Sequence, residues 1–217
     1  MDRPTTISAC GISKSFGKQR VLVDLSLSAT SGECIQLLGD NGSGKTTLLR
    51  ALSTLLSIDT GSLIIDGIDS RQNKKSIRGK IGFLGHQSLV YSQLTVLENL
   101  SFSSMLFQIL DFHARIQQVL DFVGLAIYKD RRAGMLSHGL RKRISLARVL
   151  LQNPKILLLD EPETGLDSQG ISILKELINT NRAKGGTIVM TTHNPESTRS
   201  LADRTLVLVG GKTAPSL

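Results

Sequence analysis

The sequence predicts an α/β protein: a parallel β-sheet covered by helices on both faces and interrupted by a helical insertion. In the last third of the chain, apolar runs at residues 156–159 and Thr187–Thr191 enclose a stretch with helical periodicity. A strand–helix–strand order with continuously apolar strands is typical of a parallel sheet with both faces covered. In the middle of the chain, over about residues 88–150, helical periodicity replaces the strand pattern, which predicts the insertion.

The first third of the chain has the pattern of strands. Residues 21–27 alternate in part between apolar and polar, Cys34–Leu38 form a short apolar run, and residues 62–66 precede Gly67. A glycine-rich turn lies between Cys34–Leu38 and the apolar residues 51–56, and it leads directly into a predicted apolar helix. This strand–turn–helix order is the local context in which the first candidate site is found.

Three further helices are predicted from apolar residues that recur at helical spacing. Ser137 precedes the second of them as a candidate N-cap, whereas Gly124 and Gly185-Gly186 are suited to end the first and the third. Ser168 precedes the third. The three apolar faces consist of Ile116, Val119, Leu120 and Val123; of Leu140, Ile144, Ala147 and Leu151; and of Ile171, Leu174, Leu177 and Ile178.

Length and composition limit the classes of protein that fit. The 217 residues suit one domain or two closely joined subdomains, and 40% hydrophobic content excludes a disordered, collagen-like or disulfide-scaffold chain. Cys10 and Cys34 form no metal-binding spacing, so we expect reduced thiols. No apolar run approaches the ~20 residues of a membrane span, and no secretory signal is visible. We therefore expect a cytoplasmic protein that reaches a membrane only by docking.

The net positive charge of the chain does not by itself identify a partner. Lys and Arg number 26 and Asp and Glu 18, which gives a net charge of +8. That charge suits nucleotides, nucleic acid and an anionic membrane surface equally.

The glycine-rich turn matches the pattern G-x-x-x-x-G-K-[ST] of a phosphate-binding loop. Its glycines allow successive backbone N–H groups to point at phosphate oxygens, and the helix N-terminus adds its positive end. Lys45 is expected to reach the β- and γ-phosphates, and the Thr46 hydroxyl is suited to Mg²⁺. The predicted nucleotide-binding residues are Gly39, Asn41, Gly42, Ser43, Gly44, Lys45, Thr46 and Thr47.

A second candidate site follows the apolar run 156–159, which ends in Asp160, Glu161 and Pro162. Ligands of open α/β sheets bind at the carboxyl ends of the strands. We predict that Asp160 holds Mg²⁺ through water and that Glu161 polarises the attacking water.

Together the two motifs, in this order, resemble the ATP-binding cassette (ABC) ATPases over nearly the whole chain. Gln87, 42 residues after Lys45, resembles the glutamine that reaches the metal in that family, and residues 94–100 resemble the start of its helical subdomain. His193, 32 residues after Glu161, resembles the switch histidine. Gly165-Leu166-Asp167 resembles the D-loop, and Phe16 resembles the aromatic residue that stacks on adenine.

The family's signature motif also has a counterpart, with a departure. The usual LSGGQ reads Leu136-Ser137-His138-Gly139-Leu140 here, so His138 and Leu140 replace a glycine and the glutamine. A Ser N-cap, free backbone N–H groups and the helix dipole are retained, and these are the groups that can face a γ-phosphate. Ser137, His138 and Gly139 are therefore included among the predicted nucleotide-binding residues.

The resemblance implies a fold, cofactors and partners. The fold is a phosphate-loop NTPase (RecA-like) core with an N-terminal antiparallel β subdomain and an inserted helical subdomain. A single domain, 1–217, would divide into core segments 1–87 and 151–217 and a helical signature subdomain, 88–150. The resemblance further implies ATP with Mg²⁺ (Thr46, Gln87 and Asp160 as metal ligands), a dimer that encloses two ATP molecules, and catalysis by Glu161, His193 and Gln87.

The same resemblance implies transmembrane transporter subunits as partners, bound near residues 88–95, with no nucleic acid and with a location at the cytoplasmic face of the inner membrane. Local similarity around His86-Gln87 and Thr191-Thr192-His193-Asn194-Pro195 is greatest to the ATP-binding subunit of the haem exporter of cytochrome c maturation. Two alternatives remain open at this stage. One is an exporter ATPase for a drug, lipid or polysaccharide, and the other is a soluble ABC ATPase that acts on nucleic acid or the ribosome.

Overall fold

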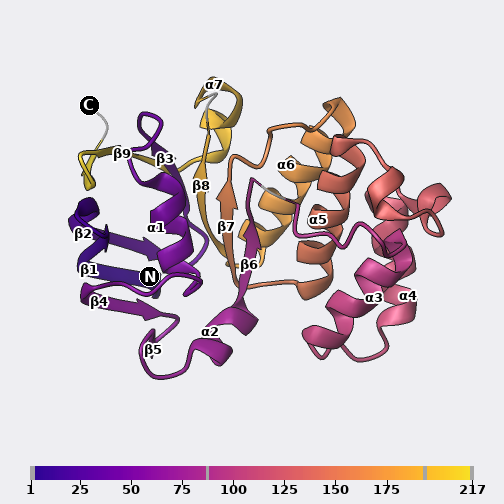
Figure 1. Cartoon of the computed structure of the whole chain (residues 1–217), viewed down its shortest axis with the longest axis horizontal. Helices are drawn as coiled ribbons and strands as arrows, with labels where there is room; N and C mark the ends of the chain where they lie inside the picture. Colours follow the sequence, from indigo (N-terminus) through magenta and orange to yellow (C-terminus); the bar gives the residue numbers. More distant parts are fainter. Residues whose placement is uncertain (1–2, 87, 193–194, 216–217) are drawn as a thin grey trace.

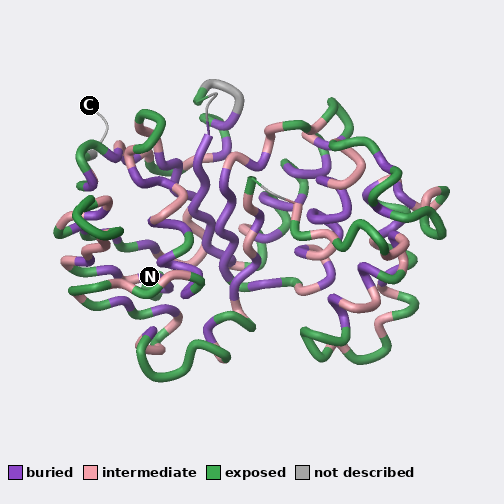
Figure 2. Tube along the Cα trace, viewed as in Figure 1, coloured by how far each residue is buried: buried purple, intermediate pink, exposed green. Residues whose placement is uncertain are grey.

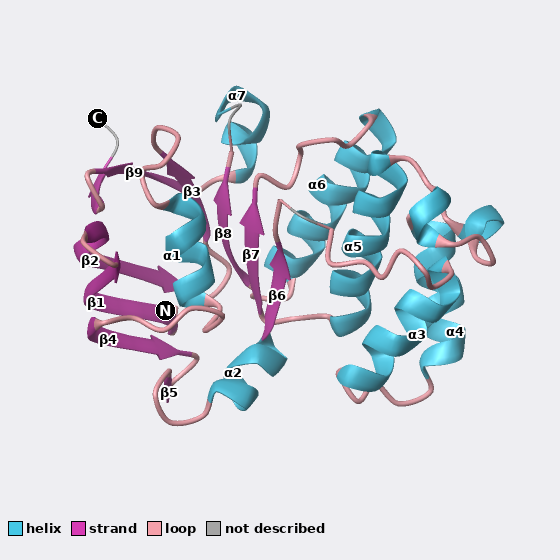
Figure 3. Ribbon diagram, viewed as in Figure 1, coloured by secondary structure: helices cyan, strands magenta, loops and turns pink. Residues whose placement is uncertain are grey.

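The computed structural model describes residues 3–86, 88–192 and 195–215, and it contains two β-sheets and a helical region (Figures 1 and 3). The antiparallel sheet and the helical region lie on opposite sides of a central parallel sheet. The predicted α/β class with an N-terminal antiparallel β subdomain and an inserted helical subdomain is confirmed.

The central sheet has the strand order β10-β9-β3-β8-β7-β6. Its five parallel strands are β3 (Cys34–Leu38), β6 (Ile81–Leu84), β7 (Ile156–Asp160), β8 (Thr187–Thr191) and β9 (Arg204–Val209), and β10 (Lys212–Pro215) pairs antiparallel with β9 at the edge. All residues of β7 and β8 are buried, as Figure 2 shows. Continuous burial explains why these strands are apolar without alternation.

The second sheet is antiparallel, with the order β2-β1-β4-β5. It consists of β1 (Thr5–Phe16), β2 (Gln19–Thr30), β4 (Thr60–Ile65) and the short β5 (Ile68–Asp69). Helix α1 (Lys45–Leu52) packs between this sheet and the central one, because Leu48 and Leu49 belong to the same buried cluster as Ile7 and Leu158. This packing fixes α1, and the loop before it, against both sheets.

The other face of the central sheet is covered by α5 (His138–Gln152) and α6 (Ser168–Ala183). Leu157 and Leu159 of β7 belong to the cluster on this side, whereas Ile156 and Leu158 belong to the cluster around α1. Alternate side chains of one strand therefore supply both cores.

Helices α3 (Val96–Leu106) and α4 (Phe112–Phe122), with short 3₁₀ turns η1 (Ala126–Tyr128) and η2 (Ala133–Met135), pack against α5 on its outer side (Figure 1). The remaining helical elements are α2 (Lys74–Lys80), α7 (Pro195–Thr198) and η3 (Arg199–Leu201). Among the described residues, no helix is both long and apolar enough to cross a membrane.

Three predicted helix ends are confirmed, and one predicted helix is placed wrongly. The Ser137 hydroxyl accepts from the Leu140 N–H (3.3 Å), Gly124 follows α4 with φ +67°, and Gly185 follows α6 with φ +81°. However, α1 begins at Lys45, inside the phosphate-binding motif, and ends at Leu52, so residues 53–56 are not helical. The Ser53 hydroxyl bonds back to the Arg50 carbonyl, and Thr54 has φ +58°; this local geometry ends the helix early.

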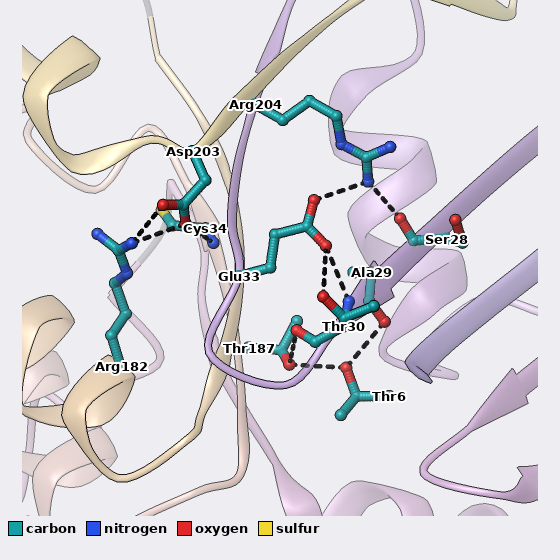
Figure 4. Close-up of polar contacts among 10 residues, drawn as sticks. All are labelled: Thr6, Ser28, Ala29, Thr30, Glu33, Cys34, Arg182, Thr187, Asp203 and Arg204. Carbon is teal, nitrogen blue, oxygen red and sulfur yellow. Dashed lines mark hydrogen bonds and ion pairs between the residues drawn. The ribbon is translucent and has the colours of Figure 1, made fainter. Parts of the chain in front are cut away.

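A polar network joins the two sheets at the end of β3 that is remote from the phosphate loop (Figure 4). The Thr6 and Thr187 hydroxyls lie 2.6 Å apart, and Arg204 pairs with Glu33. Nearby, Arg182 of α6 donates to both carboxylate oxygens of Asp203, which accepts from the Cys34 N–H. Cys34 is a free, buried thiol, and burial raises its pKa to about 12. These contacts anchor one end of β3 while its other end leads into the site.

Candidate functional site

The candidate site lies at the carboxyl ends of β3, β7 and β8. These strands are parallel neighbours, so the segments that follow them meet at one edge of the sheet. The phosphate loop follows β3, Asp160 ends β7 and Glu161 follows it, and Thr191 ends β8. The two motifs that were predicted independently are thus brought to the same edge.

The phosphate loop curls around the amine of its own lysine. Lys45 is 6% exposed, and its Nζ donates to the carbonyls of Gly39 (2.7 Å) and Asp40 (2.9 Å). Gly44 has φ +105°, and a Cβ on it would lie 3.0 Å from the Val21 carbonyl oxygen, so glycine is required there by both backbone and space. Lys45 is the first residue of α1, whose first N–H groups have no partners within the helix. This geometry is suited to hold an anion.

Hydrogen bonds with Thr191 of β8 hold Asp160 and Glu161 in place at the end of β7. The Thr191 hydroxyl donates to Asp160 Oδ1 (2.8 Å) and accepts from the Glu161 N–H (2.9 Å). Asp160 is 3% exposed, and Glu161 has φ +49°, a conformation that few non-glycine residues adopt. Strained backbone of this kind is concentrated at functional sites.

A pocket of about 320 Å³ brings most of the predicted nucleotide-binding residues together. Phe16, half exposed at 52%, stands at this pocket, and Glu161 contributes to its wall. Gly39 and Ser43 do not line the pocket, but the Ser43 Oγ is shielded from solvent and has no hydrogen-bond partner among the described residues. The lining residues are Phe16, Val21, Asn41, Gly42, Gly44, Lys45, Thr46, Thr47 and Glu161.

A larger pocket, of about 650 Å³, shares Thr46 and Glu161 with the first. It extends past the end of β6 to Leu89, which is 57% exposed, and includes Leu55, which is 54% exposed. The site edge therefore opens directly onto the segment 88–95 that was predicted to bind partner subunits. The lining residues are Thr46, Arg50, Leu55, Phe83, Gly85, His86, Leu89, Asp160 and Glu161.

The donor set at this edge fits Mg²⁺. Thr46 contributes a hydroxyl and Asp160 a buried carboxylate, and both line the same pocket. Mg²⁺ prefers one or two such oxygen ligands together with substrate phosphates. No cluster of three or more His, Cys, Asp or Glu side chains suited to a metal occurs in the described part of the chain, so a dedicated all-protein metal cage is not what these residues form.

The signature residues lie apart from both pockets. Ser137 caps α5, and His138 and Gly139 are its first residues; none of the three lines the pocket at the phosphate loop or the larger one. The His138 ring packs against Gly165, where a Cβ would collide with it. The departure from the usual signature therefore places an imidazole against the D-loop of the same chain.

Asp167 also lies at the D-loop. Its carboxylate caps α6 by accepting from the Gly170 N–H (2.8 Å) and pairs with Arg143 of α5. The hydrogen bonds from Arg143 and then from Gly170 hold the Asp167 pKa below its usual range. Asp167 thus fixes the D-loop to the signature helix within one chain.

Gln87 and His193 lie outside the described residues, so their predicted roles stay predictions. Their neighbours are described: Gly85 and His86 line the larger pocket, and the Thr192 hydroxyl donates to Glu163 Oε1. The loops that carry both residues therefore start at the site edge.

Sequence reasoning missed three residues at this edge. His86 Nδ1 lies 4.0 Å from Glu161 Oε2, Lys142 is 1% exposed and bonds the Gly85 carbonyl, and Glu163 accepts from Thr192. The position of His86 directly before Gln87 was a usable signal. For Lys142 and Glu163, on a helix and in a loop, only the fold reveals the proximity.

Comparisons with known proteins agree with this geometry. The family described as "ABC transporter" matches residues 22–164. The chain is 33% identical over 214 residues to the ABC transporter ATP-binding protein NatA of Bacillus subtilis, which covers 95% of this chain and 86% of NatA. It is 35% identical over 211 residues to the Nod factor export ATP-binding protein I of Rhizobium johnstonii, at 96% and 68% coverage.

A third relative and a solved structure extend the comparison. The cytochrome c biogenesis ATP-binding export protein CcmA of Aliivibrio fischeri is 39% identical over 176 residues, which are 81% of this chain and 86% of CcmA. A dimeric ATP-binding cassette in a post-hydrolysis state, bound to ADP and phosphate, superimposes with a TM-score of 0.86 at 27% identity. That match covers 95% of this chain and 96% of the other.

Proposed function

This chain belongs to the ABC transporter family of ATP-binding proteins and is an ATPase, and on that premise we propose how it hydrolyses ATP and what the hydrolysis drives. The observation that carries the proposal is the pocket in which Lys45 and Thr46 of the phosphate loop face Glu161. A nucleoside triphosphate on the loop would present its γ-phosphate toward the Glu161 carboxylate. Phe16, at the same pocket, is suited to stack on the base.

In the proposed reaction Glu161 accepts a proton from the water whose oxygen attacks the γ-phosphorus, the bond from that phosphorus to the β,γ-bridging oxygen breaks, and ADP and phosphate are the products. The loop amides, the Lys45 ammonium and the start of α1 stabilise the negative charge that spreads over the phosphoryl oxygens. Thr46 and Asp160, with Gln87, would hold Mg²⁺, which supplies further positive charge at the phosphates. His193 is proposed to support the attack of water on the γ-phosphate together with Glu161.

We propose that the active form is a dimer of two copies of this chain. The signature residues Ser137, His138 and Gly139 lie apart from the pocket at the phosphate loop of their own chain, and a related cassette is described as dimeric. In a two-fold dimer, the start of α5 would face the γ-phosphate held by the partner. ATP then binds the closed state better than the open one because the γ-phosphate contacts both chains, which is the differential affinity that a switch requires.

The work of hydrolysis is proposed to be delivered to separate membrane subunits. The larger pocket supports this proposal, because Thr46 and Glu161 line it together with the exposed Leu89 of segment 88–95. An apolar loop of a membrane subunit seated there would sense changes at the site directly. We accordingly propose a peripheral location at the cytoplasmic face of the inner membrane.

For the transported substrate, we propose haem for cytochrome c biogenesis. Support comes from the 39% identity to CcmA and from the sequence around His86-Gln87 and residues 191–195. The similarity to proteins named for Nod factor export and to NatA favours the alternative, an export ATPase for another substrate.

Affinity purification of the tagged full chain from detergent-solubilised membranes tests the transporter proposal. Co-purified membrane proteins of cytochrome c maturation would support haem export, and a different set of membrane subunits would keep the transporter and refute the substrate. Recovery of ribosomes or nucleic acid in place of membrane subunits would refute the transport role.

A further inference from the structure

A lysine lies almost wholly buried beside the site at the carboxyl ends of the central strands. Lys142, in the second turn of α5, is 1% exposed, and its Nζ donates to the Gly85 carbonyl oxygen (3.0 Å). Gly85 follows β6 and lies two residues before Gln87. Lysine side chains are almost never fully buried unless they are paired, so a specific interaction must retain this one.

Three carboxylates act on the Lys142 amine. Burial lowers its pKa, and the negative charges of Asp160, Glu163 and Glu161 oppose that effect. Asp160 and Glu161 belong to the reaction as proposed above. Glu163 has no role in it, although it lies two residues after Glu161.

Glu163 is itself only half satisfied. Its Oε1 accepts from the Thr192 hydroxyl, next to His193, whereas its Oε2 is shielded from solvent and has no hydrogen-bond partner among the described residues. A buried carboxylate oxygen without a partner is unfavourable unless a positive charge lies nearby. The Lys142 ammonium acts on Glu163 electrostatically and not through a direct hydrogen bond, and it has N–H groups beyond the one that bonds Gly85.

We propose that Lys142 and Glu163 act as a pair of positioning residues for ATP hydrolysis. Lys142 holds the backbone that leads to Gln87, and Glu163 holds the Thr192 hydroxyl beside His193. The attraction between the two charges keeps these loops in fixed positions beside Asp160 and Glu161. This inference rests on the proposed function, because it assigns the pair to the loops of that reaction.

A purely structural role would not require a lysine at this position. A whole buried ion pair can often be replaced by apolar side chains of similar volume with a neutral or stabilising effect. The charge is therefore better explained by the loops that it joins than by packing of α5.

The test uses four variants of the full chain. Lys142→Met removes the charge and the donor, and Lys142→Gln retains an N–H donor for Gly85 but no charge. Glu163→Gln removes the second charge, and the double variant K142M/E163Q completes a double-mutant cycle. Arg115→Met is the matched control, because Arg115, like Lys142, donates to a backbone carbonyl, in this case that of Leu150 at the far end of α5.

Amide hydrogen exchange of the nucleotide-free chain gives the first readout. Lys142→Met should accelerate exchange about tenfold in peptides that contain Gly85 and in those that contain Thr192, as expected for loss of a charge-assisted hydrogen bond. Peptides of the phosphate loop should not change, and Arg115→Met should alter neither loop. Faster exchange spread evenly along α5, with both loops unchanged, would overturn the proposal.

The kinetic readout is kcat at saturating ATP. Lys142→Met and Glu163→Gln should each lower kcat about tenfold with little change in KM, and Lys142→Gln should recover part of the loss. The double variant should resemble the worse single variant, since coupled residues are not additive. Independent, multiplicative losses would overturn the pairing. A native chain that neither binds nor hydrolyses ATP would instead refute the proposed function, while the exchange measurement would still decide whether the pair holds the loops.

Discussion

The Arg143 guanidinium of the signature helix is paired with the Asp167 carboxylate at the start of α6. Nη2 lies 2.6 Å from Oδ1, and a second Arg143 nitrogen donates to Gln169 (2.8 Å). Arg143 is buried, whereas the Asp167 side chain is 61% exposed. The pair therefore connects the helix that carries Ser137 with the D-loop at the surface of the molecule.

Two substitutions at Asp167 separate its cap from its ion pair. Asp167→Asn retains an N-cap oxygen for the Gly170 N–H but loses the charge, and Asp167→Ala loses both. We expect D167A to be less stable than D167N by about 1 kcal/mol, the typical contribution of an N-cap. Urea unfolding followed by circular dichroism measures the difference. Equal destabilisation in both variants would show that the cap contributes nothing.

Glu161→Gln should leave ATP binding intact and slow hydrolysis by a factor of about 10² or more, because the amide cannot accept the proton from water. ATP would then persist at the interface, and a dimer should accumulate. Size-exclusion chromatography with ATP detects the dimer, and phosphate release measures the rate. Glu176→Gln, on the exposed side of α6, is the control. Hydrolysis at the native rate in E161Q would show that Glu161 is not the base.

Lys45→Ala should weaken nucleotide binding itself by about tenfold or more, because the ammonium that faces the β- and γ-phosphates is lost. Titration with a fluorescent ATP analogue measures the change in Kd. Lys175→Ala, an exposed lysine of α6, controls for a general loss of positive charge. An unchanged Kd in K45A would remove the phosphate loop from the proposed site.

Ser137→Arg should block ATP-dependent dimerisation while monomer binding of ATP remains. Because the Ser137 hydroxyl also caps α5, Ser137→Asn serves as the matched control, since asparagine can cap a helix without the bulk and charge of arginine. Analytical ultracentrifugation in the Glu161→Gln background distinguishes the two. A dimer in S137R as stable as in S137N would contradict the face-to-face arrangement.

Buried continuous strands and the phosphate loop were the most predictable parts of the chain. Cys34–Leu38 and Thr187–Thr191 were predicted with the bounds that the structure has, because both are apolar runs buried on two faces. Helix α3 is different: it carries apolar residues on several sides, so no single face stands out, and its clearest local signal is the capping box of Thr95 and Glu98.

The remainder of the site could not be derived from local sequence, for a physical reason. Lys142 and Gly85 are 57 residues apart, and the contact between them exists only because α5 packs beside β6. The lysine itself stands in a basic cluster, Arg141-Lys142-Arg143, and such a run of charges is usually a solvated helix face. Tertiary packing overrides this tendency by burying Lys142 and Arg143.

The Asp66 carboxylate accepts hydrogen bonds from the amines of Lys80 and Lys155, at 2.5 Å each. Asp66 follows β4 of the antiparallel sheet, and Lys155 precedes β7 of the parallel sheet, so this charge cluster joins the two sheets. The hydrogen bonds from Lys155 and then from Lys80 lower the Asp66 pKa in the folded chain. A lowered folded pKa means that the stabilisation is complete above the pKa of the unfolded chain.

The free energy of unfolding of the native chain should therefore exceed that of the Asp66→Asn variant by about 1 kcal/mol near neutral pH. The expected difference is this small because both lysines are partly exposed, so solvent screens the two ion pairs. The difference should shrink as pH falls below about 4, where the unfolded carboxyl takes up a proton before the folded one does. Asparagine tolerates the φ of +47° at this position, so the substitution tests charge and not backbone strain. Lys155→Met should likewise be less stable than the native chain near neutral pH, and its deficit should shrink below about pH 4. A stability difference between native and variant chains that grows toward acid pH would reverse the assigned sign.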